Sequence, residues 1–114
     1  MKNEKLNYIP STEKYFEYFC TKNPKGLEGL YSDDIQLTDW NGIWKGKNAV
    51  LEMNESLFNN ELFVKVTDVK QCENRTYCHI VITINDTDLK VLDVIEWNDN
   101  FTIKSIEAFD GTLT

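Results

Sequence analysis

Asp39 stands in an unusually aromatic stretch of the sequence, LYSDDIQLTDWNGIWKG at residues 30–46. Trp40 follows it directly, Trp44 comes soon after it, and the apolar Leu37 lies two positions before it. A carboxylate that is shielded from water becomes a better base, because burial disfavours its charged form. Such a group can remove a proton from a carbon next to a carbonyl if it reaches that carbon. Asp39 is therefore the first candidate for general-base chemistry.

Asp39 also has a purely structural interpretation. Asn41-Gly42 is a strong signal for a hairpin turn. An aspartate just before such a turn commonly accepts hydrogen bonds from the backbone N–H groups that follow it. The residues themselves leave both interpretations open.

Three helices are expected in the first half of the chain. Pro10-Ser11-Thr12-Glu13 is typical of a helix start, with Ser11 or Thr12 as the capping residue, and Asn23-Pro24 ends this helix. Its apolar residues form one stripe that faces a core: Tyr15, Phe16, Phe19 and Cys20. A short second helix is predicted in KGLEGLY, and a third in KNAVLEMNESLFNN after Gly46.

The hydrophobic period changes from that of a helix to that of a strand after residue 62. Four strands are predicted, in the segments LFVKVTDVKQC, TYCHIVITIN, LKVLDVIEWN and FTIKSIEAF. Short turn clusters separate them, so they should form an antiparallel meander. Helices followed by a long antiparallel sheet indicate one α+β domain over residues 1–114, in which a curved sheet wraps around the helices.

Composition excludes several classes of function. The chain has 114 residues with 19 acidic and 12 basic side chains, a formal charge of −7. Nucleic acids and anionic membranes should therefore be repelled. No apolar run is long enough to span a bilayer, and no secretion signal is evident at the N-terminus, so a cytoplasmic protein without membrane contact is expected. The 14 aromatic residues can build a real core.

The order of elements and two local segments resemble a known superfamily. GLEGLYSDDIQLTDWNGIWKGKNAVLEM is the more specific segment, and DVIEWNDNFTIKSIEAF contributes the looser match in the sheet. Together they resemble the nuclear-transport-factor-2-like superfamily, which includes the SnoaL-like polyketide cyclases and the ketosteroid isomerases. The resemblance runs from Tyr15 to Phe109. It implies a cone-shaped α+β fold in which three N-terminal helices and a curved, mostly antiparallel sheet enclose a pocket.

The resemblance to ketosteroid isomerase also implies roles for three residues. Asp39 falls at the position of the general base, Tyr15 at that of the tyrosine that stabilises the oxyanion, and Asp93 at that of a protonated aspartic acid that donates a second hydrogen bond. Asn54 replaces a tyrosine that supports the oxyanion tyrosine in that enzyme. The implied activity is a cofactor-independent isomerase or cyclase that moves a proton on a small apolar carbonyl compound.

The expected binding pocket is apolar and aromatic. Its expected lining comprises six residues: Trp40, Trp44, Phe58, Val91, Ile95 and Trp97. The tryptophans and Tyr15 could equally be core residues, and Asp93 could pair with Lys90 or Lys104. The alternative function is a non-catalytic module of the same fold that binds a small apolar ligand or dimerises.

Two further expectations concern metals and partners. His79 is the only histidine and lacks carboxylates at ligand spacing, so no metal site is predicted and His79 is expected at the surface or an interface. Leu92 and Val94 face away from Asp93 on a strand that is apolar on both sides. A strand that is apolar on both faces should be covered on both. The helices cover one face, and a second subunit is expected to cover the other, so a homodimer joined through the sheet is expected.

Overall fold

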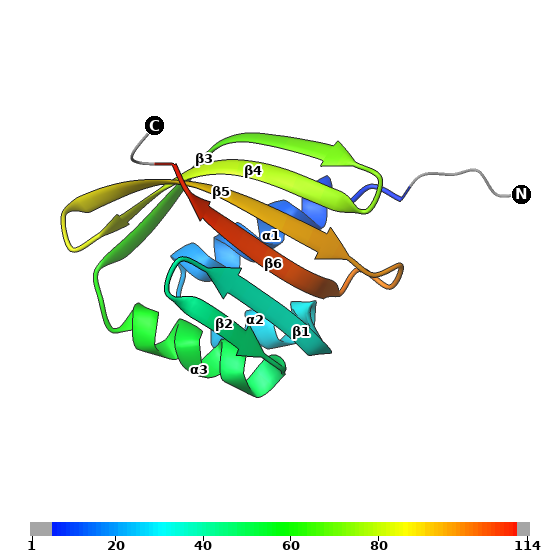
Figure 1. Cartoon of the computed structure of the whole chain (residues 1–114), viewed down its shortest axis with the longest axis horizontal. Coiled ribbons are helices and arrows are strands. Elements are labelled where there is room, and N and C mark those ends of the chain that lie inside the picture. Colours follow the sequence, from blue (N-terminus) through cyan, green and yellow to red (C-terminus); the bar gives the residue numbers. More distant parts are fainter. Residues whose placement is uncertain (1–5, 112–114) are drawn as a thin grey trace, which may run out of the picture.

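The computed structural model describes residues 6–111, which form three helices and six strands (Figure 1). The helices are α1 (Ile9–Cys20), α2 (Pro24–Leu30) and α3 (Lys47–Phe58). The strands are β1 (Tyr31–Asp39), β2 (Gly42–Lys45), β3 (Leu62–Cys72), β4 (Arg75–Ile84), β5 (Thr87–Trp97) and β6 (Ile103–Asp110). Among these residues no helix is long and apolar enough to cross a membrane.

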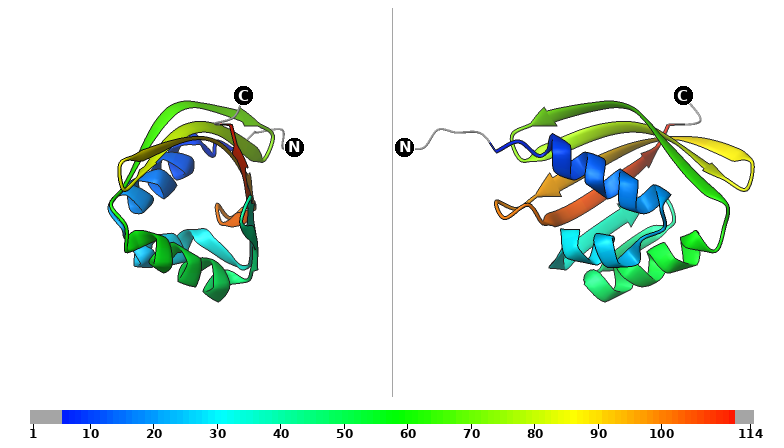
Figure 2. Two further views of the ribbon diagram at one scale, coloured as in Figure 1. Left: turned by 60° about the vertical axis from the view of Figure 1, so that its left-hand side comes forward. Right: turned by 180° about the vertical axis from the view of Figure 1, so that it is seen from behind.

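All six strands belong to one sheet in the order β2-β1-β6-β5-β4-β3. The predicted meander of β3 to β6 and the short β1–β2 hairpin are both present, and every pairing is antiparallel except β1 with β6. That parallel pairing joins the hairpin to the meander. Figure 2 shows the sheet curling around the helices, so the predicted α+β cone is confirmed.

Helix α1 begins two residues before the predicted capping pair. Its first residue is Ile9 and Tyr8 occupies the cap position, so the expectation that Ser11 or Thr12 caps the helix is wrong. Pro10 explains the difference, because the first turn of a helix tolerates proline, whose missing N–H would have no partner there. Thr12 instead lies inside the helix, where its hydroxyl donates to the Tyr8 carbonyl at 2.8 Å.

The turn from β2 into α3 depends on one glycine. Gly46 has φ +91°, in the region that residues with a side chain rarely adopt. Its N–H donates to the carbonyl of Ile35 at 2.7 Å, which ties the turn to β1. This geometry brings α3 back along the hairpin and across the open end of the cone.

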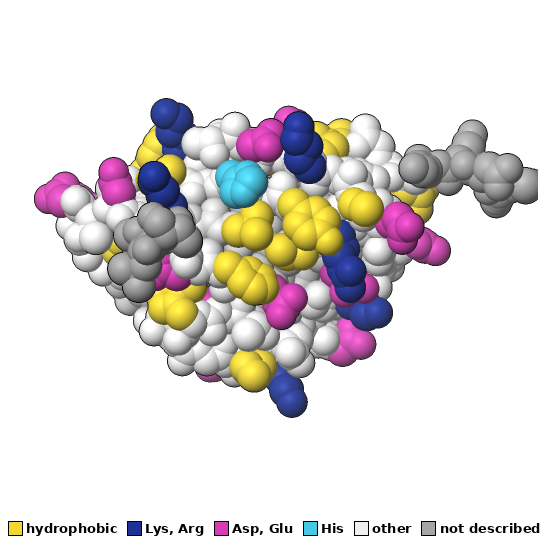
Figure 3. All heavy atoms as spheres, turned by 45° about the horizontal axis from the view of Figure 1, so that its top comes forward, with side chains coloured by type: hydrophobic (Ala, Val, Ile, Leu, Met, Phe, Trp, Pro, Cys, Tyr) yellow, Lys and Arg dark blue, Asp and Glu magenta, His cyan; other side chains and the backbone are white. Residues whose placement is uncertain are grey.

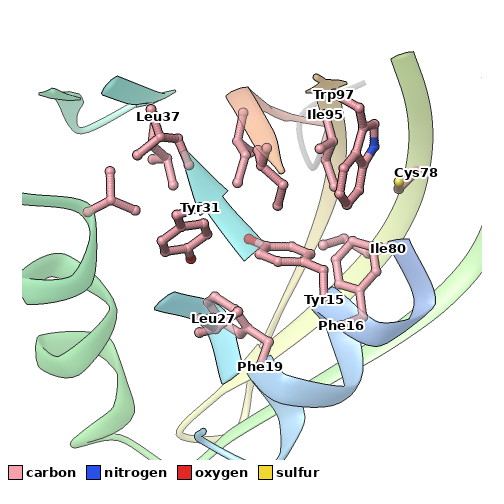
Figure 4. Close-up of a cluster of buried hydrophobic side chains, with 14 of the residues drawn as sticks. Tyr15, Phe16, Phe19, Leu27, Tyr31, Leu37, Cys78, Ile80, Ile95 and Trp97 are labelled. Atoms are coloured by element: carbon pink, nitrogen blue, oxygen red, sulfur yellow. The ribbon is translucent and has the colours of Figure 1, made fainter. Parts of the chain in front are cut away.

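The core lies between the concave face of the sheet and the helices (Figure 4). The predicted stripe of α1 is confirmed, with Tyr15, Phe16 and Phe19 buried and Cys20 half-buried. On the sheet, alternate residues of β4, β5 and β6 face inward, and Asp93 is the charged member of that inner set. The fold therefore buries a carboxyl group among apolar side chains.

Candidate functional site

A cavity of about 490 Å³ opens between the concave sheet and helices α1 and α3. Its wall is predominantly apolar, with Leu37, Met53, Leu57, Ile82 and Ile106 among the lining residues. Trp40, Asn41 and Ser56 line it and are exposed, which places its mouth between the β1–β2 turn and α3. This size suits a small organic molecule.

The three residues expected to carry chemistry all line this cavity. Tyr15 comes from α1, Asp39 from the end of β1 and Asp93 from the middle of β5. They are distant in sequence, and the curled sheet brings them to one enclosed space. The geometric condition for a joint role is thus met.

Asp93 is the most perturbed ionisable group of the cavity. Its side chain is 7% exposed, and within residues 6–111 its carboxyl group has no hydrogen-bond or ion-pair partner. Burial, and then the negative charge of Asp39, raise the pKa of Asp93 to about 7. The alternative pairing with Lys90 or Lys104 is not present, since Lys104 pairs with Glu96 and Lys90 is not a partner of Asp93.

Asp39 is both a turn residue and a residue of the cavity wall. Its Oδ1 accepts a hydrogen bond from the backbone N–H of Asn41 at 2.7 Å, as a turn-forming aspartate does. The side chain is nevertheless half-buried and lines the cavity beside Trp40. One oxygen is held by the turn, so the carboxylate is positioned with its second oxygen available for a ligand.

A buried hydroxyl network lies behind Tyr15. The hydroxyl of Tyr31 donates to Oδ1 of Asn54 at 2.6 Å, and it also makes a hydrogen-bonding contact with Tyr15. In Figure 4 the hydroxyl end of Tyr15 points toward Tyr31. Burial, and then the neighbouring Tyr31 and Asp93, raise the pKa of Tyr15 well above its ordinary value, so Tyr15 is a neutral phenol at physiological pH.

Tyr31 is a functional candidate that sequence reasoning missed. It is the first residue of β1 and is 1% exposed. The available signal was the spacing of inward residues along β1, where Tyr31, Ile35 and Leu37 are all buried. Asn54 is fully buried on α3 and lines the cavity, at the position where the resemblance implies a supporting tyrosine.

The six residues expected to line the pocket divide into two groups. Trp40, Trp44 and Val91 line the cavity. Phe58, Ile95 and Trp97 lie elsewhere: Phe58 packs edge-on against Phe19 with ring centroids 5.2 Å apart, and Ile95 is fully buried core.

Trp97 occupies the opposite end of the core from the cavity mouth. Its ring stacks on Tyr8 at 5.6 Å, and its Nε1 donates to the hydroxyl of Thr76 at 3.1 Å. The same hydroxyl is hydrogen-bonded to that of Thr12 at 3.0 Å. Ile95 and Trp97 share the inner face with Asp93, but they lie further along β5, where α1 fills the space. In this structure both side chains belong to the packed core.

The histidine and the cysteines lie outside the cavity lining. His79 is exposed on β4, as expected, with its Nδ1 3.9 Å from Asp68. Among the described residues, no group of three or more histidine, cysteine or acidic side chains is arranged to hold a metal ion. Cys20, Cys72 and Cys78 are free thiols.

Solved structures with the same fold come from proteins of several descriptions. A candidate ketosteroid isomerase from Kribbella flavida has a TM-score of 0.83 at 15% identity, covering 90% of this chain and 76% of that one. A candidate SnoaL-like polyketide cyclase from a Jannaschia species has a TM-score of 0.82 at 11% identity, covering 99% and 92%. An epoxide hydrolase/cyclase-like enzyme of pyran ring formation in salinomycin has a TM-score of 0.85 at 13% identity, covering 93% and 92%.

At these identities the likeness establishes the fold alone. Proteins with this fold include isomerase-like and cyclase-like proteins. No curated protein sequence matches the chain. The family model of the SnoaL-like domain matches residues 12–105, which is most of the chain and includes Tyr15, Asp39 and Asp93. The chain therefore belongs to the SnoaL-like domain family.

Proposed function

We propose that this protein is a cofactor-independent isomerase or cyclase that acts on a small apolar carbonyl compound by proton transfer. Asp39 acts as the base, and Tyr15 and Asp93 donate hydrogen bonds to the oxygen on which charge develops. The observation that supports this most is that all three side chains line one apolar cavity of about 490 Å³.

The first step removes a proton from the carbon next to the carbonyl. The free oxygen of Asp39 takes this proton, and the electron pair of the C–H bond moves to the carbonyl oxygen to give an enolate. A base that is held at the cavity wall close to this carbon needs no free base from solution. Isomerisation is completed when Asp39 returns the proton to a different carbon. In a cyclase, the enolate carbon attacks a second carbonyl carbon of the same molecule, the electron pair of that C=O bond moves to its oxygen, and this oxygen takes the proton from Asp39.

The enolate oxygen needs donors that are already in place, and these often provide the largest share of catalysis. With a pKa of about 7, Asp93 is protonated in a substantial fraction of molecules at neutral pH and can donate. Tyr15 can donate to a ligand only when its hydrogen turns away from Tyr31. A half-turn of the Asn54 amide would allow this, because its NH₂ group would then donate to Tyr31, and Tyr31 to Tyr15.

A conjugation assay tests this proposal. A β,γ-unsaturated ketone is incubated with the protein, and the absorbance of the conjugated product is followed. The wild type should convert the ketone, and the Asp39→Asn variant should convert it more slowly by a factor of about a hundred or more. A loss of this size is typical when a general base is removed. Conversion that the Asp39→Asn variant retains in full would refute the role of Asp39.

The second candidate function is a non-catalytic module that binds a small apolar ligand. The hydrogen bond from Asn41 to Asp39 favours it, since this contact gives the carboxylate a structural task. Binding of a planar phenol, seen as a shift in its absorbance, without any turnover of ketones would support this candidate.

We further propose that the protein forms a homodimer through the outer face of the sheet. Tyr77, Leu92, Val94 and Phe109 form an apolar patch there, in which Tyr77 is paired with Val94 and Leu92 with Phe109 in register. Figure 3 shows apolar side chains gathered beside the histidine on this face. A second copy of the patch would remove these side chains from water.

A further inference from the structure

The two carboxyl groups that line the cavity both offer hydrogen-bond acceptors. Asp39 has one oxygen that is not held by its turn, and Asp93 is 93% buried with no hydrogen-bond or ion-pair partner among residues 6–111. A nearly buried carboxyl group without a partner is costly, and a ligand that donates a hydrogen bond removes that cost. The carboxyl oxygens in the cavity can therefore accept hydrogen bonds from a ligand that carries a donor.

Tyr15 adds a third acceptor in the arrangement that the structure shows. Tyr31 has a single hydroxyl hydrogen and gives it to Oδ1 of Asn54 at 2.6 Å. Tyr31 can therefore only accept in its contact with Tyr15, so the hydrogen of Tyr15 is directed to Tyr31. The lone pairs of the Tyr15 oxygen are left for the cavity.

The electrostatics of the cavity favour a positive ligand. Among the described residues that line it, two are acidic and none is lysine, arginine or histidine. The ionisable groups facing Asp93 are Asp39 and Tyr31 of β1, Tyr15 of α1 and Cys78 of β4. The pKa values of Tyr15, Tyr31 and Cys78 are raised, so these three groups are neutral, and Asp39 is the one whose negative charge repels a charge on Asp93. A cation would relieve this repulsion. The aromatic faces of Trp40 and Trp44 can also attract a cation.

We propose that the cavity in this arrangement binds a small apolar amine in its protonated form. The ammonium group donates hydrogen bonds to the carboxylates of Asp93 and Asp39 and to the oxygen of Tyr15. The apolar body of the amine fills the space between Leu37, Ile82 and Ile106. The inference does not require turnover: an amine and a carbonyl compound would use opposite directions of the hydroxyl network and compete for the cavity.

Three probes of matched shape test the proposal: adamantan-1-amine, adamantan-1-ol and adamantane-1-carboxylate, with binding followed by tryptophan fluorescence or calorimetry. At about pH 8 the amine should bind the wild type at least about tenfold more tightly than the alcohol, the value of one charge-assisted hydrogen bond. The carboxylate should bind more weakly than both. Equal affinity for the amine and the alcohol, or tighter binding of the carboxylate, would overturn the proposal.

The pH profile gives a second test on the unmodified chain. As pH rises through about 7, Asp93 loses its proton and gains a charge that attracts the amine. The amine itself stays protonated over this range, as an alkylammonium group with a pKa near 10 does. Its affinity should therefore rise from about pH 6 to about pH 8, while the affinity of the alcohol stays level. A flat amine profile would contradict the role of Asp93.

Two substitutions complete the experiment. Asp93→Asn should reduce the preference for the amine over the alcohol, whereas Glu28→Gln, the same charge change on an exposed helix residue, should retain it. Tyr31→Phe frees the hydrogen of Tyr15, so it should weaken binding of the amine and strengthen binding of the carboxylate. If Tyr31 only supports the fold, all three probes should weaken together, and the proposed direction of the network would be refuted.

These outcomes are separable from those of the proposed enzyme activity. A protein that converts ketones but shows no preference for the amine refutes the amine site alone. A protein that prefers the amine but fails to convert ketones refutes the proton-transfer activity alone.

Discussion

The carboxyl group of Asp93 shares one cavity with that of Asp39, and the charge of Asp39 contributes to raising the pKa of Asp93 to about 7. The two groups come from different elements, the end of β1 and the middle of β5. Their burial differs as well: Asp93 is nearly enclosed, whereas Asp39 is half-buried and anchored by a turn. Two carboxyl groups in such unequal surroundings are suited to unequal tasks, one accepting a proton and the other holding one.

Replacing Asp39 should change the ionisation of Asp93. Asp39→Asn removes the neighbouring negative charge, so the pKa of Asp93 should fall below about 7. It should stay above the ordinary aspartate value, because burial, the larger cause, remains. A ¹³C NMR titration of the Asp93 carboxyl carbon measures this. Asp34→Asn, an exposed aspartate on the same strand, serves as control; an equal shift in both variants would show that the effect is not local.

Asp93 should make the fold less stable as pH rises. In the unfolded chain it loses its proton near pH 4, but in the folded chain only near pH 7, so between these values the folded state binds more protons. Stability should therefore decline from about pH 4 to about pH 7 and then level off, by up to about 4 kcal/mol from this group. Urea unfolding at several pH values tests this. Asp93→Asn should flatten that decline, and an unchanged decline would contradict it.

The network around Trp97 should contribute to stability and leave the cavity unaffected. Thr76→Val removes the hydroxyl that accepts from Trp97 Nε1 at 3.1 Å and is hydrogen-bonded to the Thr12 hydroxyl at 3.0 Å. Two buried polar groups lose their partner, which should lower the free energy of unfolding by about 1–3 kcal/mol. The affinity of the folded variant for a cavity ligand should match the wild type. A selective loss of ligand affinity would mean that Trp97 takes part in the site after all.

The proposed dimer should dissociate when its apolar patch receives a charge. Phe109→Glu places a carboxylate in the patch that also contains Leu92 and Val94, so sedimentation should show a monomer at micromolar concentration, where the wild type sediments as a dimer. Ile43→Glu makes a comparable change at an exposed position of β2 and should leave the dimer intact. A wild type that is already monomeric at micromolar concentration would refute the interface.

Much of the fold could be predicted because its signals are local. The stripe of α1, the hairpin signalled by Asn41-Gly42 and the alternation along β3 to β6 each depend on neighbouring residues, and all are present, although the hairpin turn itself is formed by Trp40 and Asn41. The parallel pairing of β1 with β6 left no such signal, because it joins segments far apart in the sequence. The start of α1 was misplaced because Pro10 can lie within a first helical turn.

The candidate site could also be predicted only in part from local sequence patterns. Alternation predicts that Val91, Ile95 and Trp97 share the face of Asp93, but it cannot tell how far along β5 the cavity extends. Val91 lines the cavity, while Ile95 and Trp97 lie in the packed core. The meeting of Tyr15, Asp39 and Asp93 was expected from the family resemblance, since no local pattern connects residues on three separate elements. Tyr31 was missed because its role depends on its contacts with Tyr15 and Asn54.

Hydrogen–deuterium exchange tests the central claim most directly, because it requires no knowledge of the natural substrate. A small cyclic ketone is incubated with the protein in D₂O, and NMR follows the loss of hydrogen from the carbon next to the carbonyl. The wild type should accelerate this exchange well above the rate in buffer, and Asp39→Asn should return it to the buffer rate. Exchange at the same rate in buffer, the wild type and the variant would contradict the proposal that Asp39 moves a proton in this cavity.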